Sequence, residues 1–212
     1  QSPAFVNGSS ISNATNVAAI VDGTWDAVAA QELFGDNYAC AKLPEFTGSD
    51  GNTGLQSEYL KQFIADIAES QGTAARTALR NSECLSADVN AAYDPTFSHV
   101  FEKRNSCFIN KGIVLTKYTG AGGKGGTNDA NAEFVSKVRT VFDKSGTVWQ
   151  TGELGKVDEG GGGTVAKYVA NLGVNVVDVG VPVLSMHAPF ELVAKTDVYM
   201  AFKGFKAFLE SK

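Results

Sequence analysis

The sequence lacks the features that identify several classes of protein. It contains no cluster or stripe of Lys and Arg, and its net charge of -5 is spread without long runs of one sign, which argues against a surface for nucleic-acid phosphates. No apolar run reaches the roughly 18 residues that a membrane span requires, and no charged segment followed by an apolar one stands at the start. We therefore expect a soluble protein that binds neither nucleic acid nor membrane.

Cysteine is also scarce. The three cysteines, Cys40, Cys84 and Cys107, are too few and too far apart for a disulfide framework, and none belongs to a Cys-x-x-Cys pair. We expect them to be mostly buried thiols. The order Gly-x-x-x-x-Gly-Lys-Ser/Thr is absent as well, so neither of the glycine-rich segments described below is a phosphate-binding P-loop.

The length and the apolar content allow one substantial core. The chain has 212 residues, of which 43% are hydrophobic, as in globular proteins that fold alone. We expect a polar leader over residues 1–16 and a single domain over residues 17–212. Glycosylation sequons begin at Asn7 and Asn13, and together with Gln1 at the start they leave secretion open.

The apolar pattern is typical of a layered α/β domain, because short β-branched runs alternate with helical segments. The expected strands span residues 17–21, 38–43, 85–91, 109–118, 147–150 and 174–183. The expected helices span about 25–34, 55–67, 134–142, 164–172 and 198–209. The second helix, capped by Asn52 or Thr53, should bury one stripe of apolar side chains: Leu55, Tyr59, Leu60, Phe63, Ile64 and Ile67.

Two glycine clusters stand out, one within residues 118–127 and one at residues 160–163. Four glycines directly before a helix leave backbone N–H groups free to face an anion or a carbonyl oxygen. The spacing is equally compatible with a tight connection that binds nothing.

Six ordered motifs between about Lys42 and Leu209 resemble the C-terminal half of the catalytic domain of the aspartyl aminopeptidase and aminopeptidase I family of zinc peptidases. The motifs are at residues 48–57, 86–95, 115–120, 128–134, 149–158 and 184–187. The resemblance implies a three-layer α/β/α sandwich with a mixed, mainly parallel sheet, lacking the family's inserted assembly domain. It also implies a peptide substrate, a homo-oligomer, a cytoplasmic location and two zinc ions.

By position, the resemblance assigns roles to individual residues. Asp88 and His187 correspond to terminal zinc ligands, Asp22 to the aspartate that bridges the two ions, and Glu45 to the general base. Carboxylate and imidazole are donors that zinc accepts, and a glutamate can take the proton of a metal-bound water. The substrate side would include Lys117, Gly120, Lys124, Gly162, Gly163 and Thr164.

The sequence departs from the family pattern at the metal site. Where the family has two adjacent glutamates, this chain has Glu45-Phe46, and the ring of Phe46 has no lone pair to donate. We also expect no counterpart in this chain of the segment that carries the family's first histidine ligand. Each zinc would therefore lose one terminal ligand, although Asp22, Asp88 and His187 could still hold one ion with open positions.

Three hypotheses remain. The first is a zinc aminopeptidase domain that removes N-terminal residues from peptides through a metal-activated water, with an incomplete metal site in this chain. The second is a catalytically inert relative with a structural or assembly role. The third is a peptide-binding module that uses the glycine-rich loops without hydrolysis. Under the first hypothesis, we expect the isolated chain to be inactive or weakly active.

Overall fold

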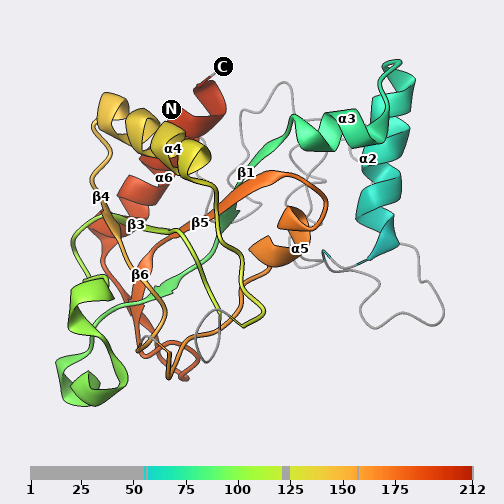
Figure 1. The fold of residues 1–212 in the computed structure, drawn as a ribbon. Helices are drawn as coiled ribbons and strands as arrows, with labels where there is room; N and C mark the ends of the chain where they lie inside the picture. Colours follow the sequence, from blue (N-terminus) through green and yellow to red (C-terminus); the bar gives the residue numbers. More distant parts are fainter. Residues whose placement is uncertain (1–54, 56, 121–124, 157, 212) are drawn as a thin grey trace, which may run out of the picture. The chain divides into compact units, whose positions relative to one another are not determined.

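The computed structural model describes residues 55, 57–120, 125–156 and 158–211 (Figure 1). All of them belong to one compact unit, Ser49–Lys212. Several expectations lie outside the described part. They are the leader, the two strands before residue 44, the helix over 25–34 and the site residues Asp22, Glu45, Phe46 and Lys124. The expected domain boundaries therefore stay a prediction.

The central sheet is mixed and mainly parallel, as the resemblance implies. Its strands are arranged in the order β1 (Glu83–Ala87), β5 (Asn175–Gly180), β3 (Ile113–Thr116) and β4 (Trp149–Thr151). β1 is parallel to β5, and β3 is parallel to β4, whereas β3 and β5 are antiparallel.

A second, smaller sheet continues from the first. It contains β2 (Asn90–Ala91), β6 (Pro182–Leu184) and β7 (Leu192–Val193), with β2 parallel to β6 and β7 antiparallel to β6. The expected strands at 85–91 and 174–183 are each divided between the two sheets. The division occurs where the backbone of Asp88 crosses Gly180: a side-chain carbon added to Gly180 would lie 1.0 Å from the Asp88 carbonyl oxygen. Only glycine allows this approach.

Helices cover both faces of the central sheet and complete the three-layer sandwich (Figure 1). α4 (Ala132–Ser145) and α6 (Lys195–Glu210) pack on each other and on one face, where the core contains Val177 and Val179 of β5. The shorter α5 (Ala166–Ala170) contacts β5. Because side chains alternate along a strand, Val176 and Asp178 point to the face opposite α4 and α6.

Local sequence signals explain the bounds of α4. The side chain of Asn131 accepts a hydrogen bond from Phe134 N at 2.7 Å, and Gly146 ends the helix in the left-handed conformation with φ 64°. Both are preferred terminal residues. Phe134, Val138 and Phe142 form the buried face of the helix, and the helix expected over 134–142 is confirmed.

The expected burial of the α2 stripe is wrong. α2 (Glu58–Ser70) begins after Ser57 instead of Asn52 or Thr53, and within it only Ala68 is buried. Phe63 and Ile67 are 39% and 44% exposed. Among the described elements α2 packs mainly on the short α3 (Ala75–Arg80), which has no buried residue of its own.

Two short 3-10 helices, η4 (Pro95–Val100) and η5 (Lys103–Asn105), connect β2 to β3. Cys107 follows them and is fully buried, so that burial raises the pKa of its thiol to about 12. Burial also raises the pKa of the half-buried Cys84. The expected buried thiol is therefore confirmed for Cys107 and in part for Cys84, while Cys40 lies outside the described residues.

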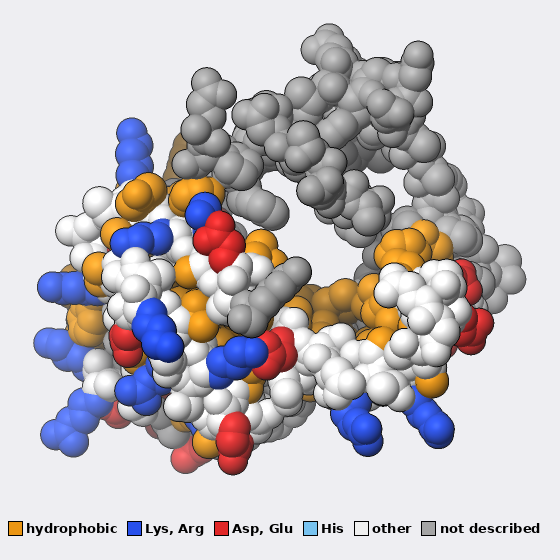
Figure 2. All heavy atoms as spheres, turned by 90° about the horizontal axis from the view of Figure 1, so that it is seen from above, with side chains coloured by type: hydrophobic (Ala, Val, Ile, Leu, Met, Phe, Trp, Pro, Cys, Tyr) orange, Lys and Arg blue, Asp and Glu red, His pale blue; other side chains and the backbone are white. Residues whose placement is uncertain are grey.

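On the face seen in Figure 2, Lys and Arg side chains occur at several separate places, and some of them lie next to Asp or Glu side chains. No helix in the described ranges is long and apolar enough to cross a membrane.

A buried carboxylate joins α6 to the turn before β3. Asp197, in the first turn of α6, is 1% exposed. Its Oδ1 accepts a hydrogen bond from Gly112 N at 2.7 Å, and its Oδ2 accepts one from Asn110 N at 2.6 Å. Asn110 and Gly112 both have positive φ, 65° and 92°, which explains why β3 starts at Ile113 and the expected strand at 109–118 is shortened.

We expect Asp197→Ala to lower the free energy of unfolding by about 3 kcal/mol, because it leaves two backbone N–H groups without their charged acceptor. Urea unfolding followed by circular dichroism measures this change. The exposed Asp66 of α2 provides the matched control, since Asp66→Ala should change stability by no more than about 0.5 kcal/mol. Equal losses for the two variants would contradict the role given to Asp197.

Candidate metal and substrate site

The predicted zinc ligand Asp88 lies where β1 ends. It directly follows Ala87, the last residue of β1, and its Oδ1 accepts a hydrogen bond from Val89 N at 2.7 Å. β1 and β5 are parallel, so their carboxyl ends meet at this edge. The carboxyl ends of parallel strands are the usual place of ligand sites in α/β proteins.

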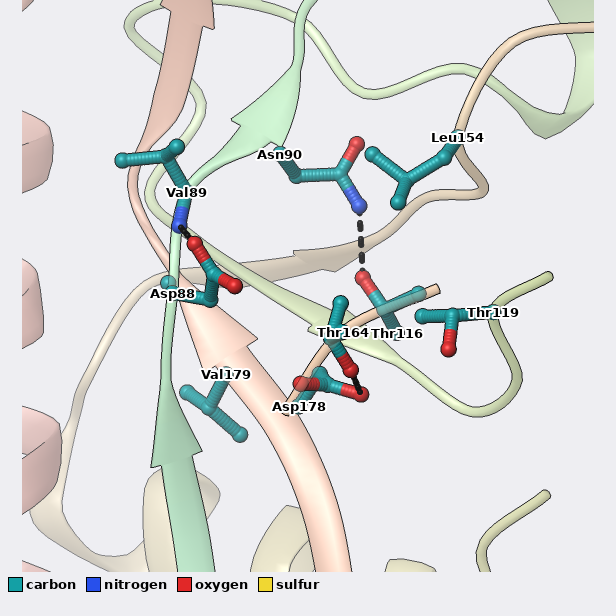
Figure 3. A pocket seen from close by; sticks show the side chains of 10 residues that line it. Asp88, Val89, Asn90, Thr116, Thr119, Leu154, Thr164, Asp178 and Val179 are labelled. Atoms are coloured by element: carbon teal, nitrogen blue, oxygen red, sulfur yellow. Dashed lines mark hydrogen bonds between the residues drawn. The ribbon is translucent and has the colours of Figure 1, made fainter. Parts of the chain in front are cut away.

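Asp88 lines a small cavity of about 10 Å³, whose other lining residues include Val89, Leu154 and Val179. Figure 3 shows the polar side chains that gather around it, namely Asp88, Asn90, Thr116, Thr119, Thr164 and Asp178. Asn90 Nδ2 donates to Thr116 Oγ1 at 2.6 Å, and Asn90 Oδ1 accepts from Cys107 Sγ at 3.3 Å. The cavity thus has a wall of hydroxyl, amide and carboxylate groups, part of which is held in place by hydrogen bonds.

Asp178 is a second carboxylate of this cavity, and the sequence analysis missed it. It lies on β5 and is 4% exposed. Burial raises the pKa of the Asp178 carboxyl; hydrogen bonding to Ser86 and Thr164 opposes this shift, and the negative charge of Asp88 adds to it. The available signal was one acidic residue within the otherwise apolar run 176–183.

The two glycine-rich segments lie against each other beside the cavity. Gly120 N donates a hydrogen bond to Gly162 O at 3.0 Å. Gly161 has φ 99°, and a side-chain carbon added to it would lie 2.3 Å from Gly120 O. Three residues after Gly161, Thr164 Oγ1 donates to Asp178 Oδ2 at 2.9 Å. The backbone pairing and the Thr164 side chain therefore connect both loops to the central sheet.

Of the predicted substrate residues, the structure places Thr164 at the cavity of Asp88. Gly120 and Gly162 are hydrogen-bonded to each other, and Thr164 lines the same cavity as Asp88. Gly163 follows in the same loop, and a carbon added to it would lie 3.1 Å from Gly126 O. Lys117, which follows β3, forms an ion pair with Asp129. The substrate-binding roles of these residues stay predictions.

His187 lies in the turn after β6 and is exposed. Its backbone has φ 67°, and its N–H donates to Glu191 Oε1 at 2.6 Å. His187 is not among the described residues that line the Asp88 cavity. Within the described ranges, no group of three or more His, Cys, Asp or Glu side chains is placed to hold a metal ion. The described donors alone therefore do not form a zinc site.

Comparison with known proteins identifies the family. A family model described as aminopeptidase I zinc metalloprotease (M18) matches residues 10–209. This chain belongs to the M18 family. Probable M18 family aminopeptidase 1 of Clostridium acetobutylicum is 49% identical over 171 residues, which are 79% of this chain and 37% of that relative. The resemblance inferred from the six motifs is therefore confirmed.

Solved structures agree on the fold. An M18 aminopeptidase from Thermotoga maritima superposes with a TM-score of 0.72 at 40% identity, over 77% of this chain and 37% of that chain. The dodecamer structure of mApe1 from Saccharomyces cerevisiae gives a TM-score of 0.59 at 24% identity, over 78% and 36% of the two chains. The chain thus spans little more than a third of the length of these M18 proteins.

We expect Gly161→Ala to lower the free energy of unfolding by about 1 to 3 kcal/mol, because alanine is strained at φ 99° and its methyl group would collide with Gly120 O. Gly162→Ala provides a control in the same loop, since no atom lies within 4 Å of the added carbon. Chemical denaturation measures both variants. If Gly162→Ala were as destabilising as Gly161→Ala, the backbone contact between the loops would not be the cause.

Proposed function

We propose that this chain is a zinc aminopeptidase-like domain that removes N-terminal residues from peptides, and that its metal site is incomplete without further ligands. The observation that carries the proposal is the position of Asp88, which lines a small cavity at the carboxyl end of β1 beside two paired glycine loops. Membership of the M18 family supports the reaction class. Because Phe46 supplies no ligand and the described donors form no group able to hold a metal, activity of the isolated chain is expected to be absent or weak.

The donor set supports a partial zinc site. Asp88 and His187 supply a carboxylate and an imidazole, which are two of the groups that zinc binds. Asp22 is proposed as a bridging ligand and Glu45 as the general base. A bound zinc ion would polarise the scissile carbonyl and acidify a water molecule. Phe46 supplies no ligand, so the coordination would have to be completed by water or by another chain.

The glycine loops are proposed to hold the peptide substrate. Gly162 has open space around its Cα, so a ligand can approach its backbone closely. Gly120, Gly163, Thr164, Lys117 and Lys124 complete the proposed substrate side. Because Lys117 is paired with Asp129, we expect it to act through the position of its loop and not as a free cation.

A second candidate function is binding or assembly without hydrolysis. The observation that favours it is that the described donors do not form a group able to hold a metal, while the loops that would contact a peptide are held in place by hydrogen bonds. A homo-oligomer and a cytoplasmic location are part of the proposal under either function. The dodecamer seen for the yeast relative is a property of that protein.

Zinc binding by the full chain separates the two candidate functions. We expect metal-free protein to bind zinc in isothermal titration calorimetry and to lose this binding in His187→Ala. Glu45→Gln should bind zinc as tightly as the parent while its turnover of aminoacyl p-nitroanilide falls to background. Peptide binding without zinc binding or product would support the binding module. Full activity of Glu45→Gln would refute the assignment of the general base.

Restoring the family's acid tests the missing ligand directly. We expect Phe46→Glu to raise zinc affinity by about 10-fold or more. Mutation of residues that only hydrogen-bond to metal ligands already changes metal affinity by about that factor. Phe97→Glu on η4, where the parent ring is 56% exposed, adds the same charge at a position outside the proposed site. A zinc affinity that rises equally in both variants would indicate nonspecific attraction of the cation. An unchanged zinc affinity in Phe46→Glu would show that Phe46 does not occupy the position of the family's glutamate ligand.

A further inference from the structure

The turn between β6 and β7 contains two residues with an uncommon backbone conformation. Ser185 has φ 59° and His187 has φ 67°. At such angles a side chain crowds its own backbone, so residues other than glycine seldom adopt them. Conformations of this kind persist only where the surrounding structure imposes them, and they are concentrated at functional sites. Their occurrence at a predicted zinc ligand therefore needs a physical cause.

Packing of apolar side chains is not that cause. Between β6 and β7 only Met186 is half-buried, and the other residues of the turn are exposed. Phe190 is 90% exposed. A segment that removes so little apolar surface from water gains little stability from burial. The conformation of the turn must therefore depend on its hydrogen bonds and on the strands that close it.

The two strands close the turn at its base. β6 and β7 are antiparallel, and Leu184 is the register partner of Leu192. Glu191 directly precedes Leu192, so strand pairing holds the backbone of Glu191 next to the beginning of the turn. Within the turn, Ala188 N donates a hydrogen bond to Ser185 O at 2.9 Å. This bond accompanies the left-handed conformation of Ser185 but does not involve the amide of His187.

The amide of His187 is held by Glu191. His187 N donates to Glu191 Oε1 at 2.6 Å, and a bond from an amide to a charged carboxylate is stronger than one between neutral groups. The bond fixes the orientation of the peptide group between Met186 and His187. It thereby restricts the direction in which the His187 side chain leaves the backbone.

The imidazole ring of His187 takes no part in this contact. Among the residues that the structure describes, neither ring nitrogen has a hydrogen-bond or ion-pair partner. A metal-bound imidazole needs one nitrogen for the ion and usually donates the N–H of the other to a further group. An anchor on the backbone amide therefore orients the residue and leaves both ring nitrogens for these two tasks.

We propose that Glu191 is a positioning residue for the predicted zinc ligand His187. Its carboxylate accepts the backbone amide and keeps His187 in the left-handed conformation, so that the ring is oriented before an ion binds. The inference rests on the proposed function, because it concerns a residue of the proposed zinc site. It assigns Glu191 no contact with the metal ion.

The test compares two variants of the full chain, with Zn²⁺ as the probe after removal of metals with EDTA and dialysis. Glu191→Ala removes the acceptor, and we expect it to weaken zinc binding in isothermal titration calorimetry by about 10-fold. Glu191→Gln removes the charge but keeps Oε1 as an acceptor, so it should retain most of the zinc affinity. The comparison separates the hydrogen bond from a general attraction between the carboxylate and the cation.

A second measurement requires no metal. Amide hydrogen exchange of His187, followed by NMR, should be about 10-fold faster in Glu191→Ala than in the parent, as expected for loss of a hydrogen bond to a charged group. Glu191→Gln should restore most of the protection. Glu69→Ala removes an exposed carboxylate of α2 and should leave both measurements unchanged. Because Glu191 is exposed, its variants should fold as the parent does, which their melting temperatures check.

The outcomes distinguish this inference from the proposed function. Equal losses of zinc affinity in Glu191→Ala and Glu191→Gln would show that only the charge matters and would overturn the positioning role. Parent-like zinc affinity in Glu191→Ala would overturn it as well. If the parent binds no zinc, the proposed function fails. The exchange rate of His187 then decides the inference, and an unchanged rate in Glu191→Ala would reject Glu191 as the anchor.

Discussion

The site depends on the contact between the backbone of Asp88 and Gly180. At this point two neighbouring parallel segments leave the central sheet and enter the smaller one, β1 continuing into β2 and β5 into β6. The carbonyl of Asp88 occupies the space that a side chain at position 180 would need. The crossing takes the Asp88 side chain out of the strand ladder and places it at the cavity, so one glycine contact sets both the topology and the position of the carboxylate.

The two faces of the central sheet have different tasks. The face under α4 and α6 is apolar, with Ile113, Leu115, Val177 and Val179 in the main core, and burial of such side chains is the chief stabilising contribution in the domain. The opposite face has less apolar packing, because the buried polar residues Ser86, Thr116 and Asp178 lie there. Departures from apolar packing of this kind are expected where a protein binds a ligand.

The sequence predicted the elements whose apolar pattern is long and periodic. α4, α6 and the strands of the layered α/β domain were recognisable, because helical and strand periodicities differ and several strands are almost continuously apolar. The mixed order of the sheet was implied by the resemblance to the family. The sequence did not show that the runs at 85–91 and 174–183 each supply strands to two sheets, since the crossing at Gly180 is a contact between residues 92 positions apart. It also overestimated the burial of α2, because amphipathicity gives a helix an apolar face but does not identify what covers it.

Only part of the candidate site could be predicted from the sequence, because some of its residues belong to motifs and others are defined by their spatial neighbours. Asp88 and the glycine loops could be assigned from motifs, and the structure places Thr164 and Asp88 at one cavity. Asp178 escaped because its role comes from its neighbours: register places Ser86 and Thr116 beside it, and Thr164 reaches it from a loop. No local pattern distinguishes such an aspartate from a solvent-facing one.

The bonds from Asp197 to Asn110 and Gly112 also have a consequence for biosynthesis. They join residues 87 and 85 positions apart, so the turn that precedes β3 obtains its acceptors only after α6 has been synthesised. Until then the nascent chain must keep two backbone amides of that turn hydrated. The turn therefore cannot complete its native hydrogen bonds in step with the synthesis of β3.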